Sequence, residues 1–178
     1  MLLEREDVNP NQADTEYGRT PLSWAAENRH EGIVKMLLER EDVNPNQADS
    51  KYGRTPLSRA SQKRHEGVVE MLLEREDVNP NQADTEYGAT PLSWAAEYGH
   101  ERVVKMLLER EGVNPSQADT KYGWTPLSWA AGYGHSGIVK ILLERKDVYI
   151  ASPDTKGQTP LSLALPKGHD GITKAILE

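Results

Sequence analysis

The sequence contains no cysteine, so it offers neither a disulfide framework nor thiol chemistry. It also has no Asn-x-Ser/Thr glycosylation site, because Asn114-Pro115-Ser116 carries the forbidden proline, and no N-terminal apolar run as long as a signal peptide. No stretch approaches the roughly 18 consecutive apolar residues that a membrane span needs. These absences predict an intracellular, cytoplasmic protein with no membrane partner.

Positive charge is in the minority. The chain has 21 Lys and Arg against 28 Asp and Glu, which gives a net charge of -7 at pH 7. A protein that binds phosphates in general carries the opposite balance, so we do not expect nucleic acid or lipid surfaces as partners.

What the chain has in abundance is repetition. Its first fourteen residues recur unchanged twice, and a third time with two substitutions, at Gly112 and Ser116, always at a period of 35. Units of this length bury their apolar faces only against their neighbours, which gives an elongated array with one long exposed surface. We divide the single array, residues 1–178, into a partial repeat (1–14), repeats one to four (15–49, 50–84, 85–119 and 120–153) and a divergent C-terminal repeat five (154–178).

The first helix of each repeat is predicted at Thr-Pro. In repeat one the Thr20 hydroxyl can accept an orphan backbone N–H at the N-cap, and Pro21 has no N–H to leave unpaired. Leu22, Ala25 and Ala26 then share one face of a helix of about two turns.

The second helix is predicted from about Glu31. Its core stripe is expected at Ile33, Val34, Leu37 and Leu38, and Val43-Asn44-Pro45 ends it. Between the two helices the equivalent positions are Arg29, Arg64, Gly99, Gly134 and Gly168. Glycine suits a left-handed turn there, so arginine should cost about 1 kcal/mol.

These residues resemble ankyrin repeats. Thr20-Pro21-Leu22-Ser23-Trp24-Ala25-Ala26, then His30, Leu37-Leu38 and Asp42-Val43-Asn44 match that family's pattern, and Thr-Pro-Leu-Ser recurs at residues 20, 55, 90, 125 and 159. The departures are Ser in place of the usual His after Thr-Pro-Leu, and a period of 35 where about 33 is typical. The resemblance implies an all-α ankyrin-repeat solenoid of stacked helix-turn-helix units with extended hairpin-like loops.

No catalytic chemistry is evident. One histidine per repeat invites a metal interpretation (His30, His65, His100, His135 and His169). Neighbouring units lie roughly 8 to 10 Å apart, whereas zinc needs its nitrogens about 2 Å away. We therefore expect each histidine to hydrogen-bond an inter-helix turn, and we expect no enzyme activity, cofactor or metal.

Because the units are near copies, the positions that differ are the places to look for recognition. They are the residue before Thr, the one after Ser and one near the end of the first helix, which the resemblance places on the concave, partner-binding face. The predicted partner-binding residues are Arg19, Trp24, Arg54, Arg59, Lys63, Trp94, Tyr98, Trp124, Trp129 and Tyr133.

This face is basic in repeats one and two and aromatic in repeats three and four. The pattern suggests one polypeptide partner, with an acidic segment over the basic part and an apolar anchor over the aromatic part. The alternative is that the differences are drift at tolerant positions, with the Trp after Ser packed against the next unit.

A non-catalytic protein-binding scaffold is the leading function. A spacer solenoid without a ligand, or an arm that brings substrate to an enzyme domain absent here, are the alternatives. Self-similar arrays resemble the sensor regions of large intracellular receptors, so we expect a fragment of a larger protein. Met1 aligns with Met36 inside a second helix, so residues 1–8 should fray or should stack on another chain's end, which allows a monomer or weak end-to-end association.

Overall fold

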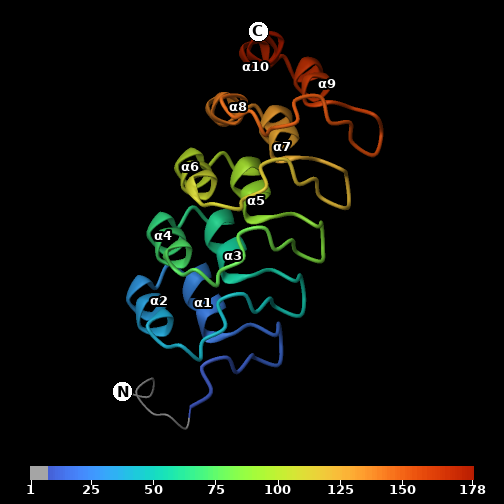
Figure 1. Cartoon of the computed structure of the whole chain (residues 1–178). Coiled ribbons are helices and arrows are strands. Elements are labelled where there is room, and N and C mark those ends of the chain that lie inside the picture. The colour runs from blue at the N-terminus through green and yellow to red at the C-terminus, as the bar shows by residue number, and fades with distance from the viewer. Residues whose placement is uncertain (1–7) are drawn as a thin grey trace.

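The computed structural model describes residues 8–178, and in that part the chain folds into ten α-helices, one 3₁₀ helix and no strand (Figure 1). The helices form two stacked columns, with the loops projecting together on one side. The first helices are α1 (Pro21–Glu27), α3 (Pro56–Gln62), α5 (Pro91–Glu97), α7 (Pro126–Tyr133) and α9 (Pro160–Ala164). The second helices are α2 (Glu31–Leu38), α4 (Glu66–Glu74), α6 (Glu101–Glu109), α8 (Ser136–Leu143) and α10 (Asp170–Leu177). This arrangement confirms the predicted all-α solenoid.

The predicted helix starts are confirmed. Thr20 is the N-cap of α1, where its hydroxyl accepts a hydrogen bond from the Ser23 amide at 3.1 Å, and proline stands at the first helical position. The same cap begins α3, α5, α7 and α9. Each first helix is therefore set by its own Thr-Pro, independently of the neighbours.

The core runs along both columns. Leu22 and Ala26 of α1 and Val34 and Leu37 of α2 are almost fully buried. Ile33 was expected in the core stripe, and this part of the prediction was wrong because its side chain is 42% exposed. The equivalent residues of later repeats are buried against the preceding second helix (Val68, Val103 and Ile138).

For Ile33 the sequence equivalent of that preceding helix falls on residues 1–7, which lie outside the described part of the chain. The expectation that residues 1–8 fray or stack on another chain falls mainly on the same segment.

The left-handed turn between the helices is confirmed. Arg29 and Arg64 have φ of 58° and 59°, and Gly99, Gly134 and Gly168 occupy the same position in later repeats with φ of 76°, 84° and 71°. Only glycine adopts this region without a Cβ clash, so the two arginines carry strain that the glycines do not.

The long loops are joined by two ladders that cross the repeats. One is a backbone ladder, in which the amides of Ser50, Thr85, Thr120 and Thr155 donate to the carbonyl of the tyrosine in the preceding loop, each at 2.9 Å. The other uses asparagine side chains. Asn46 Nδ2 donates to the Asp77 carbonyl at 2.7 Å, and Asn46 Oδ1 accepts from the Asn79 amide at 2.7 Å. Asn11 and Asn81 repeat this pair of bonds, and Ser116 replaces it with its hydroxyl.

Candidate partner-binding face

The ten predicted partner-binding residues lie on the loops and first helices, but they differ in exposure. Tyr98 and Tyr133 are about half exposed, at 49% and 51%, and Trp24 and Lys63 are also exposed. Arg54 and Trp124 are half-buried. The other four side chains are buried: Arg19, Arg59, Trp94 and Trp129.

Three of the four buried side chains, Arg59, Trp94 and Trp129, are explained by hydrogen bonds to the loop aspartates. Trp94 Nε1 donates to Asp84 Oδ2 at 2.8 Å, and Trp129 Nε1 donates to Asp119 Oδ2 at 3.0 Å. Arg59 takes the same place in repeat two, where its Nη2 lies 2.7 Å from Asp49 Oδ2. The position after Ser therefore supplies an N–H donor to the aspartate ten residues earlier. This recurring ten-residue spacing between the aspartate and its donor is visible in the sequence and could have predicted the burial.

The pKa values of two of these aspartates are shifted in opposite directions. Burial alone would raise the pKa of Asp49, but the Tyr52 amide and the Arg59 guanidinium outweigh it and hold the pKa below its usual value. Burial raises the pKa of Asp119, and the hydrogen bonds from backbone amides and the Trp129 indole do not offset that rise.

The basic half of the face is largely neutralised. Arg19 Nη1 lies 2.7 Å from Glu27 Oε2, and Arg59 Nη1 lies 2.9 Å from Glu27 Oε1. Arg54 Nη2 lies 3.0 Å from Glu86 Oε2. The face expected to be basic in repeats one and two thus contains a network of ion pairs that bridges repeats, in which Lys63 stays exposed.

The aromatic half lines a pocket of about 230 Å³ that spans repeats two to four. Six of its rings form a continuous row, in the order Tyr98, Trp94, Tyr87, Tyr122, Trp129 and Tyr133, with successive centroids 6.3, 5.6, 6.2, 5.9 and 5.8 Å apart. The remaining lining residues are Arg54, Gln62 and Glu97. We call these nine residues the aromatic pocket. Tyr87 and Tyr122 were considered only as a loop ladder from the sequence, and the structure brings them into this pocket.

Glu97 is the only carboxylate among the nine. Burial raises its pKa above the usual value, Arg54 opposes that rise and Asp119 adds to it. A half-buried carboxylate among aromatic rings is an unusual feature on a surface, since desolvation disfavours its charged form.

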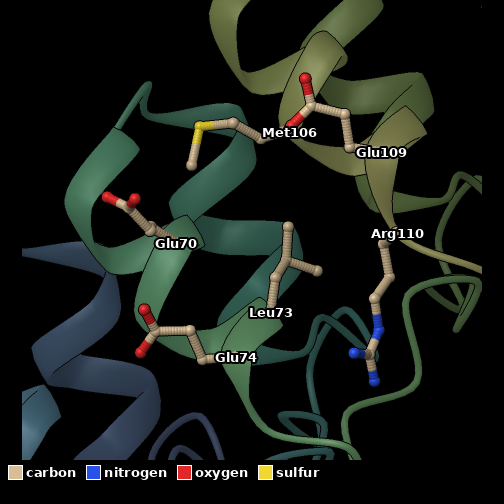
Figure 2. A pocket seen from close by; sticks show the side chains of 6 residues that line it. All are labelled: Glu70, Leu73, Glu74, Met106, Glu109 and Arg110. Carbon is tan, nitrogen blue, oxygen red and sulfur yellow. The ribbon is translucent and has the colours of Figure 1, made fainter.

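The opposite side of the molecule has grooves of a different kind. Figure 2 shows one of about 290 Å³ between α4 and α6, lined by Glu70, Leu73, Glu74, Met106, Glu109 and Arg110. The equivalent groove between α2 and α4 has the same residue types at five of its six positions, in Leu38, Glu39, Met71, Glu74 and Arg75. Because this groove recurs with the repeat, it is a product of stacking and does not single out one site.

The histidines bridge the repeats. Nε2 of His65, His100 and His135 lies 2.9, 3.0 and 2.8 Å from a carbonyl at the end of the preceding first helix, that of Glu27, Gln62 and Glu97 respectively. The bond thus reaches the neighbouring repeat, where the sequence analysis expected an inter-helix turn. Within residues 8–178 no group of three His, Asp or Glu side chains could hold a metal ion.

The fold defines a solenoid of stacked helical repeats, with the loops and first helices along one face. The family model described as ankyrin repeats (3 copies) matches residues 1–84, 45–119 and 111–178, which together span the whole sequence. The chain belongs to the ankyrin repeat family. No curated protein matches it. Ankyrin repeats are generally non-catalytic protein–protein interaction modules. In the described part of the chain, no helix has the length and apolar character needed to cross a membrane.

Proposed function

We propose that this chain is a recognition module that binds a polypeptide partner on the concave face, with its main anchor at the aromatic pocket of repeats three and four. The observation that carries the proposal is the half-exposed pair Tyr98 and Tyr133 at the rim of a pocket walled by buried tryptophans. Tyrosine and tryptophan dominate interface hot spots, because they are large, rigid and partly polar. The family usually acts inside the cell, and a cytoplasmic location is part of the proposal.

An acidic partner segment over repeats one and two has weaker support. The guanidinium groups of Arg19, Arg54 and Arg59 already have carboxylate partners. The exposed cations near this end include Lys63 and the loop residue Lys51, which lies over the Tyr17 and Tyr52 rings. They also include the two turn residues, Arg29 and Arg64, whose own ion pairs with Glu31 and Glu66 are exposed and therefore weak. A partner would gain little from an acidic segment there.

The alternatives predict different behaviour. A spacer solenoid needs no difference between the first helices of its repeats, whereas the aromatic pocket occurs once among the described repeats. A substrate-targeting arm and a sensor fragment of a larger protein both use the same face, so they are versions of the proposal and differ in what the rest of the protein does.

The experiment is a selection of displayed peptides on the purified chain, with counter-selection on the Tyr98→Ala/Tyr133→Ala variant. We expect to select peptides that bind the parent chain and do not bind the double variant. The matched control is Tyr149→Ala, because Tyr149 is 69% exposed and does not line the pocket. Selected peptides that bind the parent and the double variant equally well would contradict the proposed face. If no peptide were enriched at all, the spacer function would be favoured.

A further inference from the structure

The Glu97 carboxylate lacks the ion-pair partners of the equivalent carboxylate in repeat one, Glu27. In repeat one Glu27 is held by Arg19 from its own repeat and by Arg59 from the next. The positions equivalent to those arginines around Glu97 are Ala89 and Trp129. No hydrogen bond or ion pair reaches the Glu97 side chain from residues 8–178, which leaves a negative group in the aromatic pocket with a place for a cation.

The rings around Glu97 are suited to the same ligand. The face of an aromatic ring attracts a positive charge, and a set of rings around one site is how quaternary ammonium groups are recognised. The chain itself shows the interaction nearby, since Lys121 Nζ lies 4.1 Å from the Tyr87 centroid and Lys167 Nζ lies 5.1 Å from that of Tyr133.

Arg54 is the one cation that lines the pocket, and its charge is already balanced. Its Nη2 pairs with Glu86, its Nη1 donates to Gln62 Oε1 at 3.2 Å, and Asp84 Oδ2 lies 3.9 Å from its Nε. Its guanidinium lies over the Trp94 ring, 4.2 Å from the centroid. Arg54 therefore serves as part of the wall, and it forms no hydrogen bond or ion pair with the Glu97 carboxylate, on which its charge acts only from a distance.

The aromatic character of the lining narrows the type of cation. An unmodified ammonium is a compact, strongly hydrated charge with three N–H donors, and a guanidinium brings five donors, so both lose much hydration among aromatic rings. Six of the nine lining residues are aromatic, and the Gln62 side-chain oxygen is used by Arg54. A dimethylammonium group has a single N–H to give to Glu97, and it has methyl groups for the ring faces to cover.

We infer that the aromatic pocket binds a methylated lysine side chain of a polypeptide partner, with Glu97 accepting the remaining N–H and the six rings surrounding the methyl groups. This inference rests on the proposed function and specifies its anchor. It also fits the net charge of -7, which attracts a basic segment better than an acidic one.

The test uses three pentapeptides, Gly-Gly-X-Gly-Gly, where X is dimethyl-lysine, unmodified lysine or a neutral isostere with carbon in place of the nitrogen. Binding is followed by nuclear magnetic resonance on the indole N–H groups of Trp94 and Trp129. We expect the dimethyl-lysine peptide to bind about tenfold tighter than either comparison peptide. Glu97→Gln should weaken it about fivefold, and Tyr98→Ala should weaken it as well. Glu27→Gln is the matched control, because Glu27 already has two arginines, and it should leave binding unchanged.

Several outcomes would overturn the inference. Equal binding of the neutral isostere would make the pocket an apolar anchor, and equal binding of unmodified lysine would remove the role of the methyl groups. If Glu97→Gln left both the peptide affinity and the melting curve unchanged, the carboxylate would have no role in binding. In each of these cases a peptide selected through Tyr98 and Tyr133 still supports the proposed function, so the two failures can be told apart.

Discussion

Trp124 Nε1 donates a hydrogen bond to Asp154 Oδ2 across the boundary between repeats four and five, at 2.9 Å. In repeats one to four the donor to the loop aspartate comes from the position after Ser, but in repeat five that residue is Leu163, which has no N–H. Trp124 stands at a different variable position and supplies the missing donor. Two of the substitutions that distinguish the repeats are thus linked, because Trp124 supplies the donor that Leu163 lacks.

Removing this donor should destabilise the C-terminal end of the array. Burial alone would raise the pKa of Asp154, but the Gln158 amide and the Trp124 indole hold it below the usual value. We expect Trp124→Phe to raise that pKa and to cost about 1 kcal/mol, read from hydrogen exchange in α9 (Pro160–Ala164). The double variant Trp124→Phe/Leu163→Trp should recover most of the loss, because it restores the donor of the other repeats. Equal stability of parent and single variant would show that the bond is dispensable.

Glycine at the strained turn should stabilise the protein. Arg29 and Arg64 have positive φ, and their ion pairs with Glu31 and Glu66 are exposed. Arg64→Gly should raise the free energy of unfolding by about 1 kcal/mol, since relief of strain exceeds the loss of a surface ion pair. Urea denaturation measures the change, with Lys63→Gly beside it as a control that lacks positive φ and should not stabilise.

The asparagine ladder should contribute to the coupling between repeats. Asn46→Ala removes two hydrogen bonds to the next loop, at Asp77 and Asn79, and should cost about 1 to 2 kcal/mol. Asn46→Ser should cost less, because Ser116 of repeat three holds the equivalent two bonds to repeat four. Thermal unfolding of both variants gives the comparison. A serine variant as unstable as the alanine one would refute this role of the hydroxyl.

Asp14 should make the stability of the protein depend on pH in the acidic range. The Tyr17 amide, with smaller contributions from the Trp24 indole and other amides, lowers the pKa of Asp14 to about 2 from the usual 3.8. A lowered folded-state pKa gives stability that is fully present above the unfolded value and is lost as the pH falls. The contribution of Asp14 should therefore disappear between about pH 4 and pH 2, and Asp14→Asn should flatten this part of the stability profile. A titration of the Asp14 carboxyl carbon with a midpoint near 3.8 would contradict it.

The sequence was sufficient for the fold because each repeat specifies its own helices. Thr-Pro begins the first helix, the Arg or Gly turn separates the two, and the apolar stripe of the second helix is local. Ile33 was placed wrongly because its burial depends on the neighbouring repeat, which periodicity within one helix does not reveal.

The site was harder to predict because its side chains are shared between repeats. Position alone put Arg59, Trp94 and Trp129 on an exposed face, whereas the loop aspartates turn them inward. The state of Glu97 depends on substitutions at Ala89 and Trp129, in its own repeat and the next. The effect of a substitution in one repeat on a side chain of its neighbour can be seen only when the stacking of the units is known.

The central claim is that the aromatic pocket is where a polypeptide partner binds. The most direct measurement is calorimetric titration of a selected peptide into the parent chain, the Tyr98→Ala/Tyr133→Ala variant and the Tyr149→Ala control. We expect the double variant to lose at least about tenfold in affinity, while the affinity of the control and the melting temperatures of all three chains stay unchanged. Equal affinity of all three chains would contradict it.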